Sequence, residues 1–268
     1  SIIIMLKAFF ESAYLWLKGW WHVVYFAAIV WVAALSPSSY SLRKKLATPS
    51  QKNEPLLNYL YTCTVPVLPW FTVLMSLVSL VLIRIVVVTA QSYGLSQYAL
   101  EVVVRVLVME LLPLSAALFV AFRTMVPMSV QLLELKQKGH LNGWEVGASP
   151  LSTELVPRML AGVFAVLTLV VVSGSMALIL AYLVVNGFSI WGLSAYTRIV
   201  GQVFLPAVVI GFALKTFLFA IATATIPMAS SLQEDAKIPG YGAPPPGIVR
   251  LLTAILMIET ATLVLKYF

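Results

Sequence analysis

Ionisable side chains inside long apolar runs are the residues of this sequence with the most informative chemistry. Such a charge is costly unless it is paired or used, so it marks a binding site or a buried ion pair. Six residues fit this description, namely Arg84, Glu101, Arg105, Glu110, Lys215 and Glu259.

The first three of these predict a charged group near one end of two neighbouring helices. Glu101 and Arg105 are four residues apart, so they share a helix face and can pair. Arg84 lies late in the preceding apolar run and therefore at the same depth. Two interpretations stay open, a functional cluster or side chains that extend to the interface and hold helices together.

Glu110 lies deeper and is followed by Pro113, which removes a backbone donor and kinks a helix one turn earlier. Lys215 and Glu259 are the candidate partners of this carboxylate. A direct role with a substrate and a buried ion pair that fixes packing are both consistent with this pattern.

The sequence lacks the usual signals of a catalytic or metal centre. It has no Walker A motif, and Ser173-Gly174-Ser175-Met176 does not form a Gly-x-Ser-x-Gly elbow. Its two histidines are far apart and its only cysteine is Cys63, so no zinc or iron–sulfur pattern exists. We therefore expect no metal and no cofactor bound by this chain.

The composition of the chain indicates which kind of secondary structure carries these residues. Hydrophobic residues make up 61% of the 268 residues and charged residues only 10%, against about 25% charged in soluble domains. The net charge of +7 comes from basic residues in loops between apolar runs, which indicates membrane topology and no nucleic-acid partner. The predicted fold is an all-α polytopic membrane protein.

Five apolar runs are long enough to cross a bilayer as helices. Residues 1–36 predict an interfacial amphipathic helix that dips into the membrane, or alternatively a full span over 14–35. A basic linker at 37–55 and a five-span domain at 56–268 follow, with a polar segment at 124–155 that contains a short helix over 128–138. The predicted spans are 65–90, 98–122, 156–185, 200–226 and 248–265.

The loops at 36–55, 123–158 and 227–250 together hold ten Lys and Arg. The loops on the opposite side hold two, Arg198 and Lys266. Because basic residues concentrate in cytoplasmic loops, this bias places the three loops in the cytoplasm and the C-terminus outside.

Three stretches, in order along the chain, resemble the MlaE/YrbE permease family. The family's Glu-Leu-Gly-Pro sequence is similar to Glu110-Leu111-Leu112-Pro113, and its Pro-Arg-x-x-Ala-Gly sequence to residues 157–162. Its Lys-Ser-x-x-Phe sequence is similar to residues 215–219. Leu112 replaces a glycine and Lys136-Gln137-Lys138 replaces an acidic-Gln pair, so the chain resembles a divergent member over residues 55–268.

The resemblance implies the permease subunit of an ABC-type lipid transporter in the bacterial inner membrane, with a periplasmic C-terminus. Two copies would pair, a cytoplasmic ABC ATPase would use ATP, and an outer-side MCE-domain protein would exchange a phospholipid or similar amphiphile. A membrane-embedded lipid-modifying enzyme and a scaffold subunit without transport remain the alternatives.

The resemblance also implies two groups of functional residues. The candidates for a substrate cavity are Leu82, Arg84, Val86, Thr89, Tyr93, Arg105, Glu110 and Leu111, with Glu101, Lys215 and Glu259 as intramembrane polar residues. The candidates for ATPase coupling are Met128, Leu132, Leu133, Glu134, Lys136, Gln137 and Lys138. The leucines of this second group would need cover from lipid or from a partner because they lie beside charges.

Overall fold

The computed structural model of the chain describes residues 18–25, 28, 54–138, 150–233, 245 and 247–267. Within these ranges the structure consists of helices joined by short turns, without a strand, and five helices are long and apolar enough to cross a membrane. The predicted all-α polytopic fold is therefore confirmed. Residues 18–25 are helical, but most of the predicted N-terminal helix, the linker at 37–53 and the loop at 139–149 lie outside the described residues.

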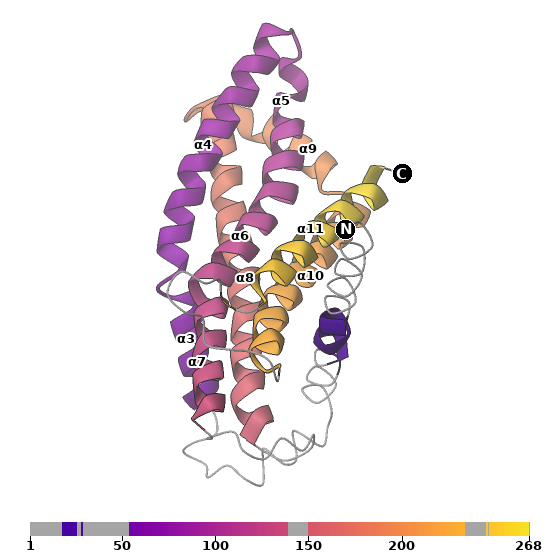
Figure 1. Ribbon diagram of the computed structural model, residues 1–268. Helices are drawn as coiled ribbons and strands as arrows, with labels where there is room; N and C mark the ends of the chain where they lie inside the picture. Colours follow the sequence, from indigo (N-terminus) through magenta and orange to yellow (C-terminus); the bar gives the residue numbers. More distant parts are fainter. Residues whose placement is uncertain are drawn as a thin grey trace, which may run out of the picture.

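The first two spans are each built from helices that follow one another along the chain, whereas the other three spans are one helix each (Figure 1). The helices are α3 (Glu54–Thr64), α4 (Leu68–Ser92), α5 (Ser96–Val103), the π-helix η1 (Val104–Leu111), α6 (Leu112–Val120), the π-helix η2 (Ala121–Met125), α7 (Val126–Gln137), α8 (Pro150–Asn186), the 3₁₀ turn η3 (Ile190–Gly192), α9 (Leu193–Val203), α10 (Pro206–Ser231) and α11 (Ile248–Tyr267).

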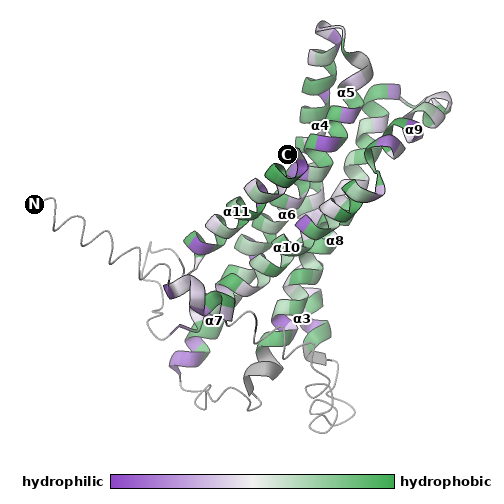
Figure 2. Ribbon diagram, turned by 90° about the vertical axis from the view of Figure 1, so that its right-hand side faces the viewer, coloured by the Kyte–Doolittle hydropathy of each residue, from purple (hydrophilic) through white to green (hydrophobic). Residues whose placement is uncertain are grey.

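Helix α8 is the centre of the bundle, because α3, α4, α6 and α10 all pack against it. Helices α4 and α5 form a hairpin at one end of the molecule, and α3 and α7 lie at the other end (Figure 1). In the view of Figure 2 the long helices are mainly hydrophobic along their length, and most hydrophilic residues lie near the helix ends. This distribution is the one expected of helices surrounded by lipid.

The second span is longer than the sequence predicts. Instead of ending at Phe122, the helix continues through η2 into α7 and ends at Gln137. Each π-helix is followed by a proline, Pro113 after η1 and Pro127 after η2. In a π turn the N–H donates to the carbonyl five residues earlier instead of four, as the Leu112 N–H does to the Leu107 carbonyl. The wider turn accommodates the following proline without ending the helix.

The fourth span begins later than predicted, because α9 and α10 are separate helices. Leu205 has an extended backbone, with φ −63° and ψ 148°. It precedes Pro206, whose ring disfavours a helical conformation in the residue before it. The prediction of one helix from residue 200 is therefore wrong, and α9 is a short helix of its own.

Gly162 allows α8 to pack closely against the second and fourth spans. A Cβ atom at this position would lie 2.5 Å from the Sδ atom of Met125 and 3.4 Å from the Cβ atom of Ala224. At Gly211, by contrast, a Cβ atom would meet nothing within 4 Å. We expect Gly162→Val to lower the free energy of unfolding by about 1–3 kcal/mol through overpacking.

The matched control for this change is Gly211→Val, which adds the same side chain to another helix at an open position. Thermal unfolding in detergent should show a clear loss for Gly162→Val and little change for Gly211→Val. Equal unfolding temperatures for the two variants would contradict the close packing at Gly162.

Candidate functional site

Four charged side chains from three helices meet in an ion cluster, defined here as Glu110, Lys215, Glu259 and Lys266. The Lys215 ammonium contacts Glu110 and lies 2.7 Å from the Glu259 Oε2 atom. The Lys266 ammonium is 2.7 Å from the other oxygen of Glu110. These contacts join η1, α10 and α11. Lys215 and Glu259 are the two residues that the sequence analysis proposed as partners of Glu110. Lys266 is an additional member, which the sequence analysis had assigned only to a loop.

The ion cluster is neutral as a unit, since it holds two carboxylates and two ammonium groups. Lys215 is its most buried member, with 4% of its side chain exposed. A charge buried to this degree is tolerated because the facing carboxylates compensate it. The four groups are paired with one another across η1, α10 and α11, so the ion cluster forms an electrostatic lock between these helices.

Glu101 and Arg105 form the pair that their spacing predicts. The Arg105 Nη2 atom is 2.9 Å from the Glu101 Oε1 atom, and both side chains are about two-fifths exposed. Arg84 does not join them: among the described residues it has no ion pair with either side chain. The predicted three-membered charged group therefore reduces to a pair and a separate arginine.

An apolar groove of about 580 Å³ runs between α4 and the second span. Its floor includes Phe71 and Phe119, whose ring centroids are 5.1 Å apart. Only Ser115 and Arg123 add polar groups to it. The lining residues are Phe71, Leu74, Met75, Val78, Leu111, Ser115, Leu118, Phe119, Phe122 and Arg123.

Leu111 is the cavity candidate that lines this groove directly. Four other cavity candidates lie on the groove side of α4, because a helix turns by about 100° per residue. They are Leu82, Val86, Thr89 and Tyr93, and they lie nearer the α4–α5 hairpin than the groove does. Leu82 and Val86 are half-buried, whereas Thr89 and Tyr93 are exposed. They extend the line of the groove, while neither Arg84 nor Arg105 lines it.

The sequence analysis missed nine of the groove residues, all except Leu111. Leu74, Val78 and Leu118 belong to the same residue types as their lipid-facing neighbours, so hydropathy does not distinguish them. Ser115 and Arg123 are the polar residues in this part of the second span, but two polar positions alone do not define a groove.

Helix α7 differs from the expected solvent-side helix. Leu132 and Leu133 are fully buried inside the chain, because α7 packs against α10. The argument that these two leucines need cover from lipid or from a partner is therefore wrong. Met128 is also buried, Glu134 is half-buried, and Gln137 and Lys138 are exposed.

Lys136 is engaged within the chain as well. Its ammonium group donates to the backbone carbonyls of Leu232, at 3.0 Å, and Gln233, at 2.7 Å. These carbonyls follow the end of α10, where a cation satisfies acceptors that the helix leaves unpaired. Lys136 thus fixes the end of α10, so its ammonium group is engaged within the chain and not presented to a partner protein.

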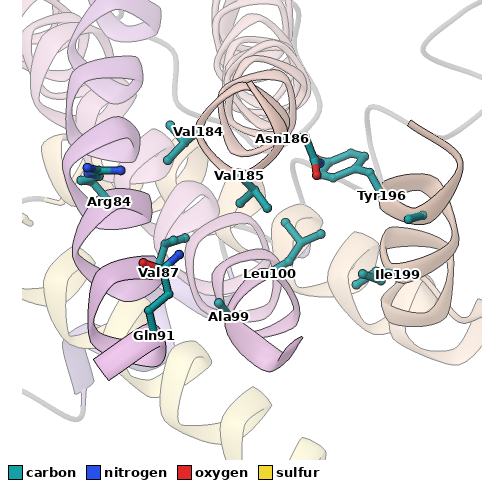
Figure 3. Close-up of a pocket in the computed structure, with 11 residues that line it drawn as sticks. Arg84, Val87, Gln91, Ala99, Leu100, Val184, Val185, Asn186, Tyr196 and Ile199 are labelled. Atoms are coloured by element: carbon teal, nitrogen blue, oxygen red, sulfur yellow. The ribbon is translucent and has the colours of Figure 1, made fainter. Parts of the chain in front are cut away.

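A second, smaller pocket of about 220 Å³ lies between α4, α5, α8 and α9 (Figure 3). Arg84 and Gln91 line it from α4, and Asn186 and Tyr196 line it from the α8 and α9 side. The sequence analysis did not predict this pocket, because α9 was expected to be partly a loop and partly the start of the fourth span.

The comparison with protein families identifies the family of this chain. A family model described as Permease MlaE matches residues 56–265, which is most of the chain. The chain belongs to the MlaE permease family. No curated protein matches it.

Membership of the MlaE family confirms the resemblance and identifies the chain as a multi-pass membrane protein of a permease family. The stretches that carried the resemblance meet in space. Glu110 of the first and Lys215 of the third are paired in the ion cluster. In the second, Arg158 is buried with its guanidinium 5.1 Å from the Tyr59 ring centre, and Gly162 packs against Met125. The MlaE-like motifs thus hold the helices together.

Proposed function

We propose that the chain is the permease subunit of an ABC-type transporter that moves a phospholipid or similar amphiphile between the bacterial inner membrane and an outer-side MCE-domain protein. The observation that carries this proposal is the family match over residues 56–265. The groove supports it, because a volume of about 580 Å³ is in the range of ligand sites and its walls suit acyl chains.

The proposed transport path forms when two copies of the chain face each other. Each groove is open along one side, so pairing about a two-fold axis would convert two grooves into one enclosed apolar cavity. Leu82, Val86, Thr89 and Tyr93 would continue this cavity toward the outer side, and Leu111 would line its middle. The ion cluster would keep η1, which carries Glu110 and Leu111, in a fixed position while the cavity opens and closes.

ATP would be used by a separate cytoplasmic ATPase and not bound by this chain. The Lys and Arg count supports a cytoplasmic position for α7 and the loop after it and a periplasmic position for the C-terminus. The proposed ATPase dock is the end of α7. It consists of the exposed residues Gln137 and Lys138, with the half-buried Glu134 beside them.

A charge reversal at Lys138 tests this dock without disturbing the fold. We expect Lys138→Glu to weaken co-purification of the ATPase several-fold at low salt and less at high salt, because exposed charges are screened by ions. Lys136 is left unchanged because it holds the end of α10. Arg198→Glu on the opposite side is the control and should leave the association intact; equal binding by both variants would exclude α7 as the dock.

The experiment that tests the function itself is transfer of a labelled phospholipid by the chain reconstituted with its ATPase and MCE-domain protein. We expect transfer that needs ATP, the ATPase and this chain together. Chemical conversion of the lipid by the purified chain alone would support an enzyme instead. Unchanged transfer in vesicles that lack the chain would show that it is a scaffold.

A further inference from the structure

The small pocket of Figure 3 is a site of its own and does not belong to the proposed transport path. Arg84, Val87 and Gln91 line it from α4, whereas Phe71, Leu74 and Met75 line the groove from the same helix. At about 100° per residue these two sets point to opposite sides of α4. A molecule in the small pocket is therefore separated from the groove by the helix itself.

Arg84 gives this pocket a positive charge that the described part of the chain does not compensate. Glu101, the nearest carboxylate along the sequence, is paired with Arg105. Among the described residues Arg84 has neither an ion pair nor a hydrogen bond nor an aromatic partner. An arginine within a membrane-spanning helix lowers its cost by binding an anion or by reaching the interface.

The other polar residues of the pocket are neutral. The Tyr196 hydroxyl donates to the Leu178 carbonyl at 2.7 Å, and its ring contacts Tyr182 edge to face, which fixes α9 against α8. Burial raises the pKa of Tyr196 to about 12, so this hydroxyl adds no negative charge near neutral pH. Gln91 and Asn186 contribute uncharged amide groups. An anion would therefore meet one cation and several neutral polar groups.

The position of the pocket is that of lipid headgroups. The turn between α8 and α9 carries Phe188, Ile190 and Trp191, of which Trp191 is 94% exposed. Exposed aromatic residues of this kind belong at a membrane interface. The α4–α5 hairpin reaches further out than this turn in both views (Figures 1 and 2), so α4 crosses the interface region beside α9.

We propose that this pocket binds the phosphate group of an outer-leaflet phospholipid, with Arg84 as the anchoring cation. An arginine matches a phosphate through paired N–H donors. The apolar walls formed by Val87, Leu100 and Ile199 favour a lipid over inorganic phosphate, because they can contact the glycerol and upper acyl carbons. The volume of about 220 Å³ holds this part of a lipid and not a whole one.

Native mass spectrometry of the full-length chain, after partial removal of lipid and titration with phosphatidylglycerol, tests the site. We expect Arg84→Gln to need roughly ten-fold more lipid for the tightest bound molecule, since it removes the charge-assisted contact to the phosphate. Ala195→Trp, at an exposed position that lines the pocket, should have the same effect by filling it. Arg198→Gln, on the same helix but not in the pocket lining, is the matched control and should bind as the natural chain does.

Two further measurements distinguish a lipid site from a free-anion site, and this pocket from the groove. Excess inorganic phosphate should leave the lipid bound; displacement by phosphate would identify a free-anion site and overturn the lipid assignment. Leu74→Trp, in the groove, should leave this lipid bound as well, so a failed transport proposal would not affect the result. Equal lipid binding by the natural chain, Arg84→Gln and Ala195→Trp would overturn the proposal.

Discussion

Replacing Lys215 with methionine is expected to lower the free energy of unfolding by about 3–5 kcal/mol, the usual cost of removing one partner of a buried ion pair. Lys215 contacts both Glu110 and Glu259, and only 4% of its side chain is exposed. Without it, Glu110 keeps its contact with Lys266, whereas Glu259 loses its ammonium partner. One buried negative charge is then left uncompensated in apolar surroundings.

The same cluster predicts a rescue. It consists of two neutral pairs, and Glu110 keeps its contact with Lys266 when the other pair is removed. Lys215→Met combined with Glu259→Gln should therefore recover most of the stability that Lys215→Met loses. Removing both partners of a buried pair is often nearly neutral, whereas removing one is not.

Thermal unfolding in detergent measures both effects. The control is Arg105→Met, which breaks the half-exposed pair with Glu101 and should cost at most about 1 kcal/mol. The electrostatic lock between η1, α10 and α11 would be contradicted if Lys215→Met were as stable as the natural chain. It would also be contradicted if the double variant were no more stable than Lys215→Met alone.

The sequence was sufficient to predict the five spans and the charged residues that meet between them. Length and hydropathy determine which segments can cross a bilayer, and an ionisable residue in such a segment needs a partner. This is why the pairing of Glu110, Lys215 and Glu259 could be proposed without a structure. Lys266 was missed because its place at the end of the last span suggested an exposed loop residue.

The groove and the helix breaks could not be predicted in the same way. Lipid-facing, groove-lining and buried positions of these helices carry the same residue types, so periodicity does not separate Leu74 from Leu80. The polar stretch that begins at Arg123 suggested that the second span ends at Phe122, but the helix continues through the π-helix η2 into α7. The N-terminal helix over 1–36 and the proposed domain limits stay predictions, because most of these residues lie outside the described ranges.

The second large effect is expected in the groove. Leu74 lines the groove and is 49% exposed. Leu74→Trp should reduce phospholipid transfer at least about ten-fold, because the larger aromatic side chain occupies the space for acyl chains. Leu80 lies on the opposite side of α4 and is 44% exposed, so Leu80→Trp makes the same change outside the groove. Neither change removes a buried side chain, and both variants should fold.

ATP-dependent transfer of a labelled phospholipid, measured side by side for these two variants in vesicles with the ATPase and the MCE-domain protein, tests the central claim most directly. The account predicts that Leu74→Trp loses transfer while its ATPase still associates, and that Leu80→Trp transfers lipid as the natural chain does. Normal transfer by Leu74→Trp, or equal loss in both variants, would contradict a lipid path through the groove between α4 and the second span.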